Sequence, residues 1–519
     1  MRKIQILWTD DEIDLLKPHI IFLEHKGYEV ETATNGQDAI ETIREKIFDL
    51  VFLDENMPGL SGLETLTAIK RISPSTPVIM ITKSEEEDIM DQAIGSRISD
   101  YLIKPVNPKQ ILLSIKKHVD TDRLVSEKTS MDYQIEFRQL GMRINEIRTH
   151  NEWDTVYKEL VDWELKLENS EDHTLDDILS MQKQEANNAF FRYIKSNYFH
   201  WLDPKSDEKP LMSHQLMKQK VFPLLKANKK VFFFIIDNLR YDHWKAIQPN
   251  LAKQFHIRED ETYFSILPTS TQYSRNAIFS GLMPSEINKI YPDLWKNDHE
   301  EGGKNMHEED MVKKMIHRFF GNEKSVHYEK AYDIQYVKKI NSRLNNLLHY
   351  DLNTIVVNFV DMLSHARTDV KMIKDLTENE AAYRSLTKSW FQHSPLLELF
   401  NEIAEIGAEV IITSDHGAIR VQNPIRIVGE RTTTTNLRYK QGKSLNYNPK
   451  EVFEITDPQK AYLPKSNISS TYVFASGNDY FVYPNNYNQY MKMYKDSFQH
   501  GGISMEEMLI PIIHLTPKS

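Results

Sequence analysis

The sequence predicts an α/β protein in three parts, and three observations along the chain support this fold class. Residues 1–120 alternate short apolar runs with helical patterns, and residues 121–210 carry apolar side chains at helical spacings. From 211 to 519, strand-like apolar runs return between long polar insertions. Strands that alternate with helices are typical of parallel sheets. We therefore expect a doubly wound, flavodoxin-like parallel sheet over 1–120, a helical middle domain over 121–210 and a C-terminal α/β domain over 211–519.

The composition of the 519 residues narrows the function classes. Lys and Arg number 64 against 75 Asp and Glu, so no overall field attracts nucleic acid or an anionic membrane. No apolar stretch approaches the roughly 18 residues that span a bilayer, and the first residues turn acidic before a signal peptide could form. With no Cys, any metal must be held by His and carboxylate. We expect a cytoplasmic protein without membrane insertion.

Five apolar runs predict the strands of the first sheet. They are KIQILW, YEVETA, FDLVFLD, TPVIMIT and DYLIKP, and helix-like sequence follows each of them. Five strands and five helices at this spacing predict βα units that repeat along one sheet.

A polar set occupies the ends of these predicted strands. Asp10 and Asp11 follow the first strand, Asp54 ends the third, Thr82 ends the fourth and Lys104 follows the fifth. Parallel strands bring these ends to one edge, where the three carboxylates can hold Mg²⁺. Asp54 is then placed to accept a phosphoryl group, with Lys104 and Thr82 near its oxygens. Any one of these carboxylates alone could be a solvated loop residue, but the three carboxylates, the threonine and the lysine in this order favour a switch.

The segments TDDE, FLDENMPGLSG, MIT and YLIKP resemble a response regulator receiver domain over about residues 1–120. The resemblance implies that a histidine kinase phosphorylates Asp54 and that Mg²⁺ is the receiver cofactor. It also implies a readout through the face near Tyr101 and a homodimer that forms on phosphorylation.

Two apolar stripes predict the helices of the middle domain. Residues three and four apart recur first at Trp153, Val156, Leu160, Trp163 and Leu167, and then at Phe190, Phe191, Ile194, Tyr198 and Trp201. The polar segment 202–210, LDPKSDEKP, is expected to be a linker. These helices separate the two candidate sites, so we expect them to transmit the switch, and a passive spacer is the alternative.

Seven further residues have the composition of a two-metal phosphoryl-transfer site. Several follow the apolar runs VFFFII, TIVVNFV and EVIITS, and the full set is Asp237, Thr271, Asp361, His365, Asp415, His416 and His500. The spacing of Asp361 and His365 places both on one face of a helix or tight turn. Thr271 precedes an apolar periodic run, so it can lie at a helix N-terminus, where a phosphate binds well. Gly417 is expected to permit a sharp turn after His416.

This mixture of imidazoles and carboxylates suits zinc best, with manganese a less favoured occupant. Two ions about 4 Å apart would stabilise the attacking and leaving oxygens of an in-line displacement. An isolated His500 or Asp237 would more often be a structural residue, but the combination favours a metal site.

The segments ILPTSTQYSRNAIFSGLMPSEI, DMLSHA, TSDHG and QHGG resemble the alkaline phosphatase superfamily over about 211–519. The closest likeness is to its nucleotide phosphodiesterase type and to the PglZ branch. The resemblance implies that Thr271 is the covalent nucleophile. It assigns two zinc ions, one held by Asp237, Thr271, Asp415 and His416, the other by Asp361, His365 and His500. Because Thr271 is neither Cys nor Ser, the sulfatase branch is disfavoured. A receiver followed by this domain further resembles the PorX-type regulators of type IX secretion.

Basic residues offer candidates for substrate binding. Arg275 lies one helical turn after Thr271 and could face a phosphate oxygen. Segment 420–443 is basic within an acidic chain, and we expect Arg431 and Arg438 there to bind a polyanionic substrate. A solvent-facing Arg275 and a solvated basic loop are equally open alternatives.

Three functions follow from these patterns. The first is a response regulator whose receiver controls a zinc-dependent phosphodiesterase of nucleotides or oligonucleotides. The alternative is a non-catalytic signalling module that binds zinc structurally and recruits a partner such as a sigma factor or a secretion-system component. A DNA-binding transcription factor is disfavoured by the acidic balance and by the lack of a short helix-turn-helix pair after residue 120.

Overall fold

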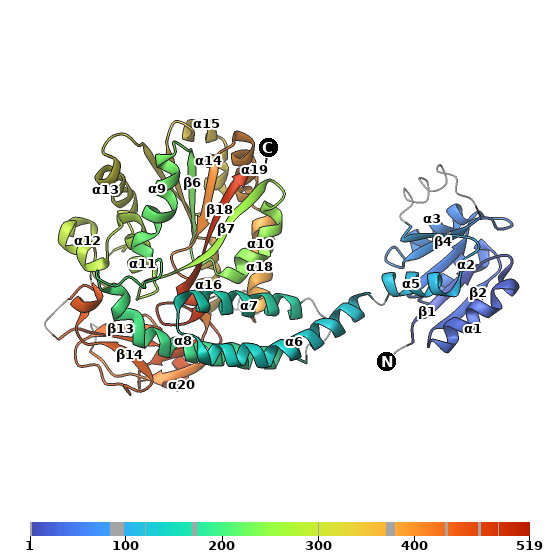
Figure 1. Cartoon of the computed structure of the whole chain (residues 1–519), viewed down its shortest axis with the longest axis horizontal. Helices are drawn as coiled ribbons and strands as arrows, with labels where there is room; N and C mark the ends of the chain where they lie inside the picture. Colours follow the sequence, from blue (N-terminus) through green and yellow to red (C-terminus); the bar gives the residue numbers. More distant parts are fainter. Residues whose placement is uncertain are drawn as a thin grey trace. The chain divides into compact units, whose positions relative to one another are not determined.

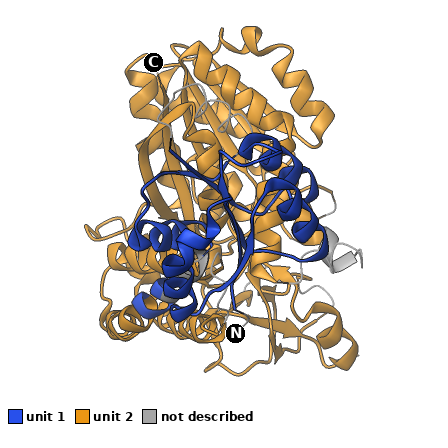
Figure 2. Ribbon diagram, turned by 90° about the vertical axis from the view of Figure 1, so that its right-hand side faces the viewer, with its two compact units in different colours: residues 1–132, 169–173 blue, residues 133–168, 174–519 orange. Residues whose placement is uncertain are grey.

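The structure is a computed structural model that describes residues 3–83, 98–119, 121–168, 174–298, 300, 302–369, 379–430, 434–465, 469–485 and 487–518. Side chains within 121–127 and 366–369 are not described. The chain folds into two compact units, one over Met1–Asp132 and the other over Tyr133–Glu168 and Thr174–Ser519 (Figure 2).

The first unit is a five-stranded sheet with helices on both faces. Its strands are β1 (Gln5–Thr9), β2 (Glu29–Ala33), β3 (Leu50–Asp54), β4 (Val78–Thr82) and β5 (Asp100–Ile103). They pair in the order β2-β1-β3-β4-β5, all parallel, which confirms the predicted doubly wound sheet. The described helices are α1 (Lys17–His25), α2 (Gly36–Glu45), α3 (Gly62–Ile72) and α5 (Pro108–His118). The remaining predicted helix falls in 84–97, outside the described residues.

Alternating side chains of this sheet form two cores. Leu7 and Val51 belong to one buried cluster, whereas Ile6 and Trp8 belong to the other. Since successive residues of a strand point to opposite faces, both faces of a parallel sheet must be covered, and every residue of β3 and β4 is buried accordingly.

The predicted middle helices are confirmed. They are α6 (Thr121–Glu146), α7 (His150–Glu168) and α8 (Asp176–Leu202). Trp153 of α7 packs edge-on against Phe190 of α8 at 5.1 Å between ring centroids. Trp201 of α8 in turn contacts Phe264 of the C-terminal sheet at 5.0 Å. These aromatic contacts place α7 and α8 in one compact unit with the C-terminal sheet, and the three-part division of the sequence stays a prediction.

The C-terminal sheet has six strands in the order β7-β18-β10-β6-β9-β8. Strands β6 (Val231–Ile236), β8 (Val326–Ala331), β9 (Leu352–Val357) and β10 (Glu409–Thr413) are parallel. Strand β18 (Leu509–Pro517) runs antiparallel between β10 and β7 (Phe255–Phe264). The sheet is therefore mixed: the expected parallel arrangement holds for four strands, and the last strand of the chain returns in the opposite direction.

Helices cover this sheet, and small sheets gather at one end of it (Figure 1). The helices are α9 (Phe222–Lys226), α10 (Tyr241–Leu251), α11 (Thr271–Ser280), α12 (Pro284–Ile290), α13 (Glu308–Phe320), α14 (Ile334–Asn341), α15 (Leu344–Leu347), α16 (Phe359–Asp369), α18 (Glu380–His393), α19 (Pro395–Ile406), α20 (Tyr487–Tyr494) and α21 (Met505–Met508). The small strands are β11 (Ile419–Arg420), β12 (Asn423–Arg426), β13 (Tyr439–Gly442), β14 (Val452–Ile455), β15 (Thr471–Ala475), β16 (Asp479–Val482) and β17 (Phe498–Gln499). Within the described parts of the chain, no helix has the length and apolarity that a bilayer crossing requires.

Candidate functional site

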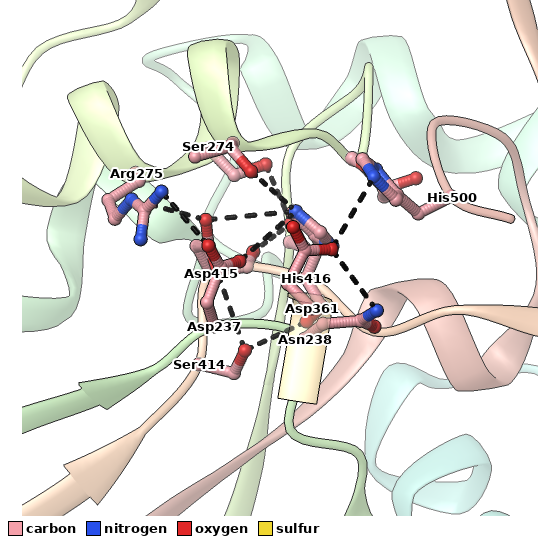
Figure 3. Close-up of polar contacts among 12 residues, drawn as sticks. Asp237, Asn238, Ser274, Arg275, Asp361, Ser414, Asp415, His416 and His500 are labelled. Atoms are coloured by element: carbon pink, nitrogen blue, oxygen red, sulfur yellow. Dashed lines mark hydrogen bonds and ion pairs between the residues drawn. The ribbon is translucent and has the colours of Figure 1, made fainter. Parts of the chain in front are cut away.

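The carboxyl ends of three neighbouring strands define the candidate site. Asp237 follows β6, Asp361 lies in the first turn of α16 after β9, and Asp415 and His416 follow β10. Because β6 pairs in parallel with both β9 and β10, these ends meet at one edge of the sheet. Figure 3 shows the three aspartates and His416 converging there.

The first group consists of Asp237, Asp415 and His416, all buried, with ligand atoms within 4.8 Å of one another. The Nε2 atom of His416 lies 3.7 Å from Oδ1 of Asp237 and 3.8 Å from Oδ2 of Asp415. Thr271 begins α11, as the sequence predicts, and its Oγ1 lies 3.0 Å from the same Nε2. One nitrogen thus faces two carboxylates and a hydroxyl.

The second group consists of Asp361, His365 and His500, again within 4.8 Å. His365 follows Asp361 by one turn of α16, and its Nε2 lies 3.5 Å from Oδ2 of Asp361. The Nε2 atom of His500 lies 4.0 Å from Oδ1 of Asp361. The rings of His416 and His500 stack, with centroids 4.0 Å apart and an angle of 14° between their planes. The two groups are therefore adjacent, and all seven predicted residues come together.

Backbone carbonyls fix the orientation of two imidazoles. Nδ1 of His500 lies 3.2 Å from the Thr269 carbonyl, and Nδ1 of His416 lies 3.2 Å from the Gly417 carbonyl. A carbonyl only accepts hydrogen bonds, so each Nδ1 carries the proton and each Nε2 keeps its lone pair. Burial lowers the pKa of His500 to about 3 and also lowers the pKa of His416. Burial therefore favours the neutral form of both rings, which is the form that binds a metal.

The buried carboxylates of the first group are under-compensated. Burial raises the pKa of Asp237 well above its usual range, although the Arg275 guanidinium opposes this shift. Burial would also raise the pKa of Asp415, but the neighbouring His416 and Arg275 outweigh it and lower that pKa. Oδ1 of Asp237 and Oδ2 of Asp415 are buried and meet no hydrogen-bond donor among the described residues. Buried oxygens of this kind are costly without a cation, so the donor set fits a divalent metal.

Arg275 does not face the substrate side. Its side chain is buried beneath the first group, with Nη2 3.1 Å from Oδ2 of Asp237 and Nε 3.0 Å from Oε1 of Glu308. The expected contact with a substrate phosphate is therefore wrong, because one turn of α11 carries this residue inward from Thr271.

The predicted substrate contacts from the basic segment also need correction. Arg438 has no exposed surface and forms a two-pronged ion pair with Glu507, at 3.1 and 2.7 Å, so it is not available to a substrate. Arg431 lies outside the described residues.

An open pocket of about 600 Å³ lies above Thr271. It exposes the second group, and its other walls are formed by Ser270, Gln272, Lys304, Asn305, Thr435, Asn436, Leu437, Tyr439, Met493, Tyr494 and Gln499. Asn305 is a residue that sequence reasoning missed, and its Nδ2 donates to the Thr271 carbonyl at 2.9 Å. No local sequence pattern marks it, because it comes from a loop 34 residues away.

Two further supporting residues were also missed. Asn238 adopts a left-handed φ of 66°, and its Nδ2 lies 3.4 Å from Oδ1 of Asp361. Ser414 Oγ accepts from the Leu239 backbone at 3.0 Å and donates to the His416 carbonyl at 2.8 Å. An Asn directly after a strand-terminal Asp is a usable signal, since Asn tolerates the left-handed conformation.

Gly417 is required for a different reason from the predicted turn. Its φ lies outside the left-handed region, but a Cβ atom there would stand 2.0 Å from the Glu506 carbonyl oxygen. The loop that carries Asp415 and His416 thus depends on close packing of two backbones.

The receiver edge gathers the other predicted set. The carboxylates of Asp10, Asp11 and Asp54 offer oxygens within 4.8 Å, and Nζ of Lys104 lies 2.8 Å from both Asp10 and Asp54. Burial raises the pKa of Asp54, whereas Lys104 opposes this shift. Thr82, the last residue of β4, donates a hydrogen bond from its hydroxyl to the Glu55 carboxylate.

Tyr101, the predicted readout residue, lies on the edge strand of the receiver sheet. Tyr101 is half-buried in β5 and packs against the core cluster that contains Leu53 and Met80.

Three family models match successive parts of the chain. Residues 6–116 match the response regulator receiver domain, and residues 123–202 match the PorX response regulator linker domain. Residues 216–515 match the BREX system PglZ alkaline phosphatase-like domain.

Curated relatives match part of the chain. The transcriptional regulatory protein ZraR of Klebsiella oxytoca is 34% identical over 139 residues, which are 27% of this chain and 31% of that protein. The transcriptional regulatory protein CpxR homolog of Haemophilus influenzae is 32% identical over 166 residues, which are 31% of this chain and 70% of that protein. The match to ZraR thus spans about a third of that protein's length (31%).

A solved CheY-like receiver domain from Methanospirillum hungatei is 29% identical, with a TM-score of 0.23, and covers 23% of this chain and 96% of its own. The PglZ model by itself matches more than half of the 519 residues. The chain therefore belongs to the PglZ alkaline phosphatase-like family and carries, ahead of that domain, a response regulator receiver domain and a PorX response regulator linker domain.

Proposed function

We propose that the chain is a cytoplasmic response regulator whose phosphorylated receiver controls a zinc-dependent phosphodiesterase acting on nucleotides or oligonucleotides. The observation that carries the proposal is the placement of the Thr271 hydroxyl, 3.0 Å from His416 Nε2, at the floor of the pocket. The first zinc would be held by Asp237, Thr271, Asp415 and His416, and the second by Asp361, His365 and His500.

The residues of the chain divide the work as follows. Thr271 loses its proton to solvent and attacks phosphorus through Oγ1, forming a phosphothreonine ester as the leaving oxygen departs and takes up a proton. Water then attacks the same phosphorus, which releases the phosphate monoester and restores the threonine hydroxyl. Its position at the N-terminus of α11 directs backbone N–H groups and the positive end of the helix toward the phosphate. Zinc at the two groups, when bound, supplies positive charge to the attacking and leaving oxygens. The carbonyls that fix His416 and His500 keep both Nε2 atoms directed at this centre.

The walls of the pocket support a nucleotide substrate. A volume of about 600 Å³ lies in the range of pockets for small organic ligands. Tyr439 and Tyr494 offer aromatic surfaces, and Asn436 and Gln499 bring amide groups to the same pocket. Aromatic faces beside polar groups are suited to a base that stacks and forms hydrogen bonds.

The test is hydrolysis of bis(p-nitrophenyl) phosphate by the full chain. Thr271→Val should lower turnover at least a thousandfold while the zinc content, measured by elemental analysis, stays near that of the wild type. Thr155→Val is the matched control, because its exposed hydroxyl donates to the Asn151 carbonyl within α7 and lies outside the pocket. If the wild type binds zinc but turns over no phosphoester, the non-catalytic signalling module replaces this proposal.

The receiver would supply the control. We propose that a histidine kinase phosphorylates Asp54, with Mg²⁺ held by Asp10, Asp11 and Asp54, and that Lys104 and Thr82 contact the phosphoryl oxygens while Tyr101 reports the change. Phosphorylation would favour a homodimer. The downstream partners would be a sigma factor or a secretion component, within the control of type IX secretion.

Phosphorylation is tested with a small phosphodonor and Mg²⁺. Asp54→Ala should take up no phosphate, whereas Asp49→Ala, directly before the same strand, should retain uptake. Light scattering of the full chain with and without beryllofluoride then reports the change in assembly, and an unaltered mass would contradict phosphorylation-dependent dimerisation.

A further inference from the structure

A buried ionic chain leads from α7 toward the loop after β10. At its centre is Arg384 of α18, which is 3% exposed. Its guanidinium lies 3.3 Å from Oε1 of Glu164 and 3.0 Å from Oε2 of Glu168, both on α7. The same guanidinium donates to Oδ2 of Asp242 at 2.6 Å. One side chain thus joins α7 to the start of α10.

The series of ion pairs continues from Asp242 to the loop of the first metal-binding group. Asp242 accepts from Nε and Nη2 of Arg240 at 2.9 and 2.6 Å. Arg240, which is 1% exposed, donates through Nη1 to the Ala418 carbonyl at 3.2 Å. Ala418 lies two residues after His416, so the ionic chain ends on the backbone of the ligand loop.

A second series of polar contacts leads from α8 to α21. Oδ1 of Asn187 accepts from the Met505 backbone at 2.8 Å, and Nδ2 donates to Glu506 at 3.0 Å. Lys183, one turn earlier, lies 2.7 Å from Glu164 and 3.8 Å from Glu506. Lys183 therefore joins the two series.

Helix α21 in turn contacts both ligand loops. Glu507 Oε1 accepts from the Gly502 backbone at 2.9 Å, two residues after His500. The Gly417 backbone, next to His416, lies 3.4 Å from the Glu507 carbonyl. The loop of each group thus rests on a segment that α8 holds directly.

Because these contacts are largely buried, breaking one of them is costly in free energy. Buried ions and amides must be paired, so a shift of α7 or α8 that breaks one pair leaves a polar group in the interior. The alternative is that the ligand loops move together with the helices. A displacement of the linker helices α7 and α8 should therefore move the two ligand loops as well.

We propose that Arg384 and Asn187 are positioning residues through which α7 and α8 set the geometry of the two metal-ligand loops, so that the linker helices control metal affinity and turnover. The inference rests on the proposed function and specifies how that site is regulated. Helix α6, which follows the receiver in the sequence, reaches the same helices where Tyr133 donates to Gln182 of α8 at 2.9 Å.

The experiment compares Arg384→Met and Asn187→Leu with the wild-type full chain. Zinc affinity is measured by competition with a chromophoric chelator, and kcat and KM are measured on bis(p-nitrophenyl) phosphate. We expect each variant to weaken zinc binding by roughly tenfold or more, as for other residues that orient ligands, and to lower kcat with KM within about twofold. Arg384→Lys, which keeps the charge, should recover part of the affinity.

Arg143→Met is the matched control. Arg143 joins α6 to α7 through Glu136 and Glu159, but its side chain is 42% exposed and its contacts do not lead to a ligand loop. It should leave zinc affinity and kcat unchanged. If Arg384→Met does not fold, Asn187→Leu decides, because it leaves the contacts of Arg384 in place.

The outcomes separate the two proposals. Folded variants with wild-type zinc affinity would overturn the positioning role, whatever their activity. A wild type that binds zinc without turnover would overturn the proposed function, while weakened zinc binding in the variants would still support the positioning role.

Discussion

The two candidate ion sites share a location in their sheets but differ in how their charge is balanced. In the receiver, Nζ of Lys104 lies 2.8 Å from both Asp10 and Asp54, and Asp11 is exposed. In the PglZ domain, Asp237 and Asp415 are buried, and each has one oxygen that accepts no hydrogen bond among the described residues, although Nε of Arg275 lies 3.5 Å from that of Asp415. A built-in ammonium that pairs with both buried carboxylates, beside the exposed Asp11, suits a cation that comes and goes. Buried, under-compensated carboxylates suit a cation that stays.

Removal of the proposed zinc ions with a chelator should have the largest effect on stability. A ligand present at a thousand times its Kd stabilises the folded state by about 4 kcal/mol. We therefore expect a chelator to lower the free energy of unfolding of the PglZ domain by about that amount, and that of the receiver by less than about 1 kcal/mol. Hydrogen exchange at β6 and at β3 reports the two regions separately. Equal loss of protection in both strands would contradict a resident metal in one site alone.

A second test alters the packing beneath the buried site. Gly417→Ala places a Cβ atom 2.0 Å from the Glu506 carbonyl, so it should destabilise the chain by about 2–3 kcal/mol and weaken zinc binding. Gly141→Ala in α6 is the control, since the nearest atom to its new Cβ is 3.9 Å away, and helix propensity should make it neutral or stabilising. Chemical denaturation with matched chelator titrations provides both measurements. A Gly417→Ala chain as stable as the wild type would show that this close approach is not required.

The buried His500 should make the free energy of unfolding of the metal-free chain depend on pH. The imidazole of His500 protonates near pH 6.5 in the unfolded chain, but burial lowers its pKa to about 3 in the folded chain. Between these values the unfolded state binds more protons, so the free energy of unfolding should fall as the pH is lowered from about 6.5, by on the order of 1 kcal/mol per pH unit. His500→Asn should flatten this slope in denaturation curves recorded with chelator. An unaltered slope would assign the acid sensitivity to other groups.

The smallest expected effect lies in the receiver. Lys104→Met removes the ammonium that occupies Asp10 and Asp54, so Mg²⁺ should bind roughly tenfold more tightly. Lys83→Met, whose partner Glu12 is 50% exposed, should change Mg²⁺ binding by less than about twofold. Intrinsic Trp fluorescence can follow the titration, because Trp8 lies two residues before Asp10. Weaker binding in Lys104→Met would show that Lys104 supports the ion instead of competing with it.

The strands, and the convergence of the seven candidate site residues, could be predicted because both depend on local order, while the role of these residues as metal ligands stays a prediction. An apolar run that ends in Asp marks a strand terminus, and parallel pairing then brings such termini together. The orientation of Arg275 and Arg438 could not be predicted in the same way. Their directions depend on buried partners that are distant in sequence, such as Glu507, which is 69 residues from Arg438.

Two features of the fold also lay beyond local patterns. The antiparallel return of β18 beside β10 depends on where the chain end packs, and an apolar run carries no sign of its direction. Asn305 lines the pocket because a distant loop folds over α11, which hydrophobic periodicity does not encode.

The face-to-face rings of His416 and His500 would link the occupancy of the two proposed zinc sites. Each ring completes a different ligand set, and at a centroid distance of 4.0 Å neither can tilt without displacing the other. Binding of the first ion would order both rings, so the second ion would bind to an imidazole that is already oriented. We therefore expect the two ions to bind cooperatively, with a sigmoidal isotherm and few singly loaded molecules.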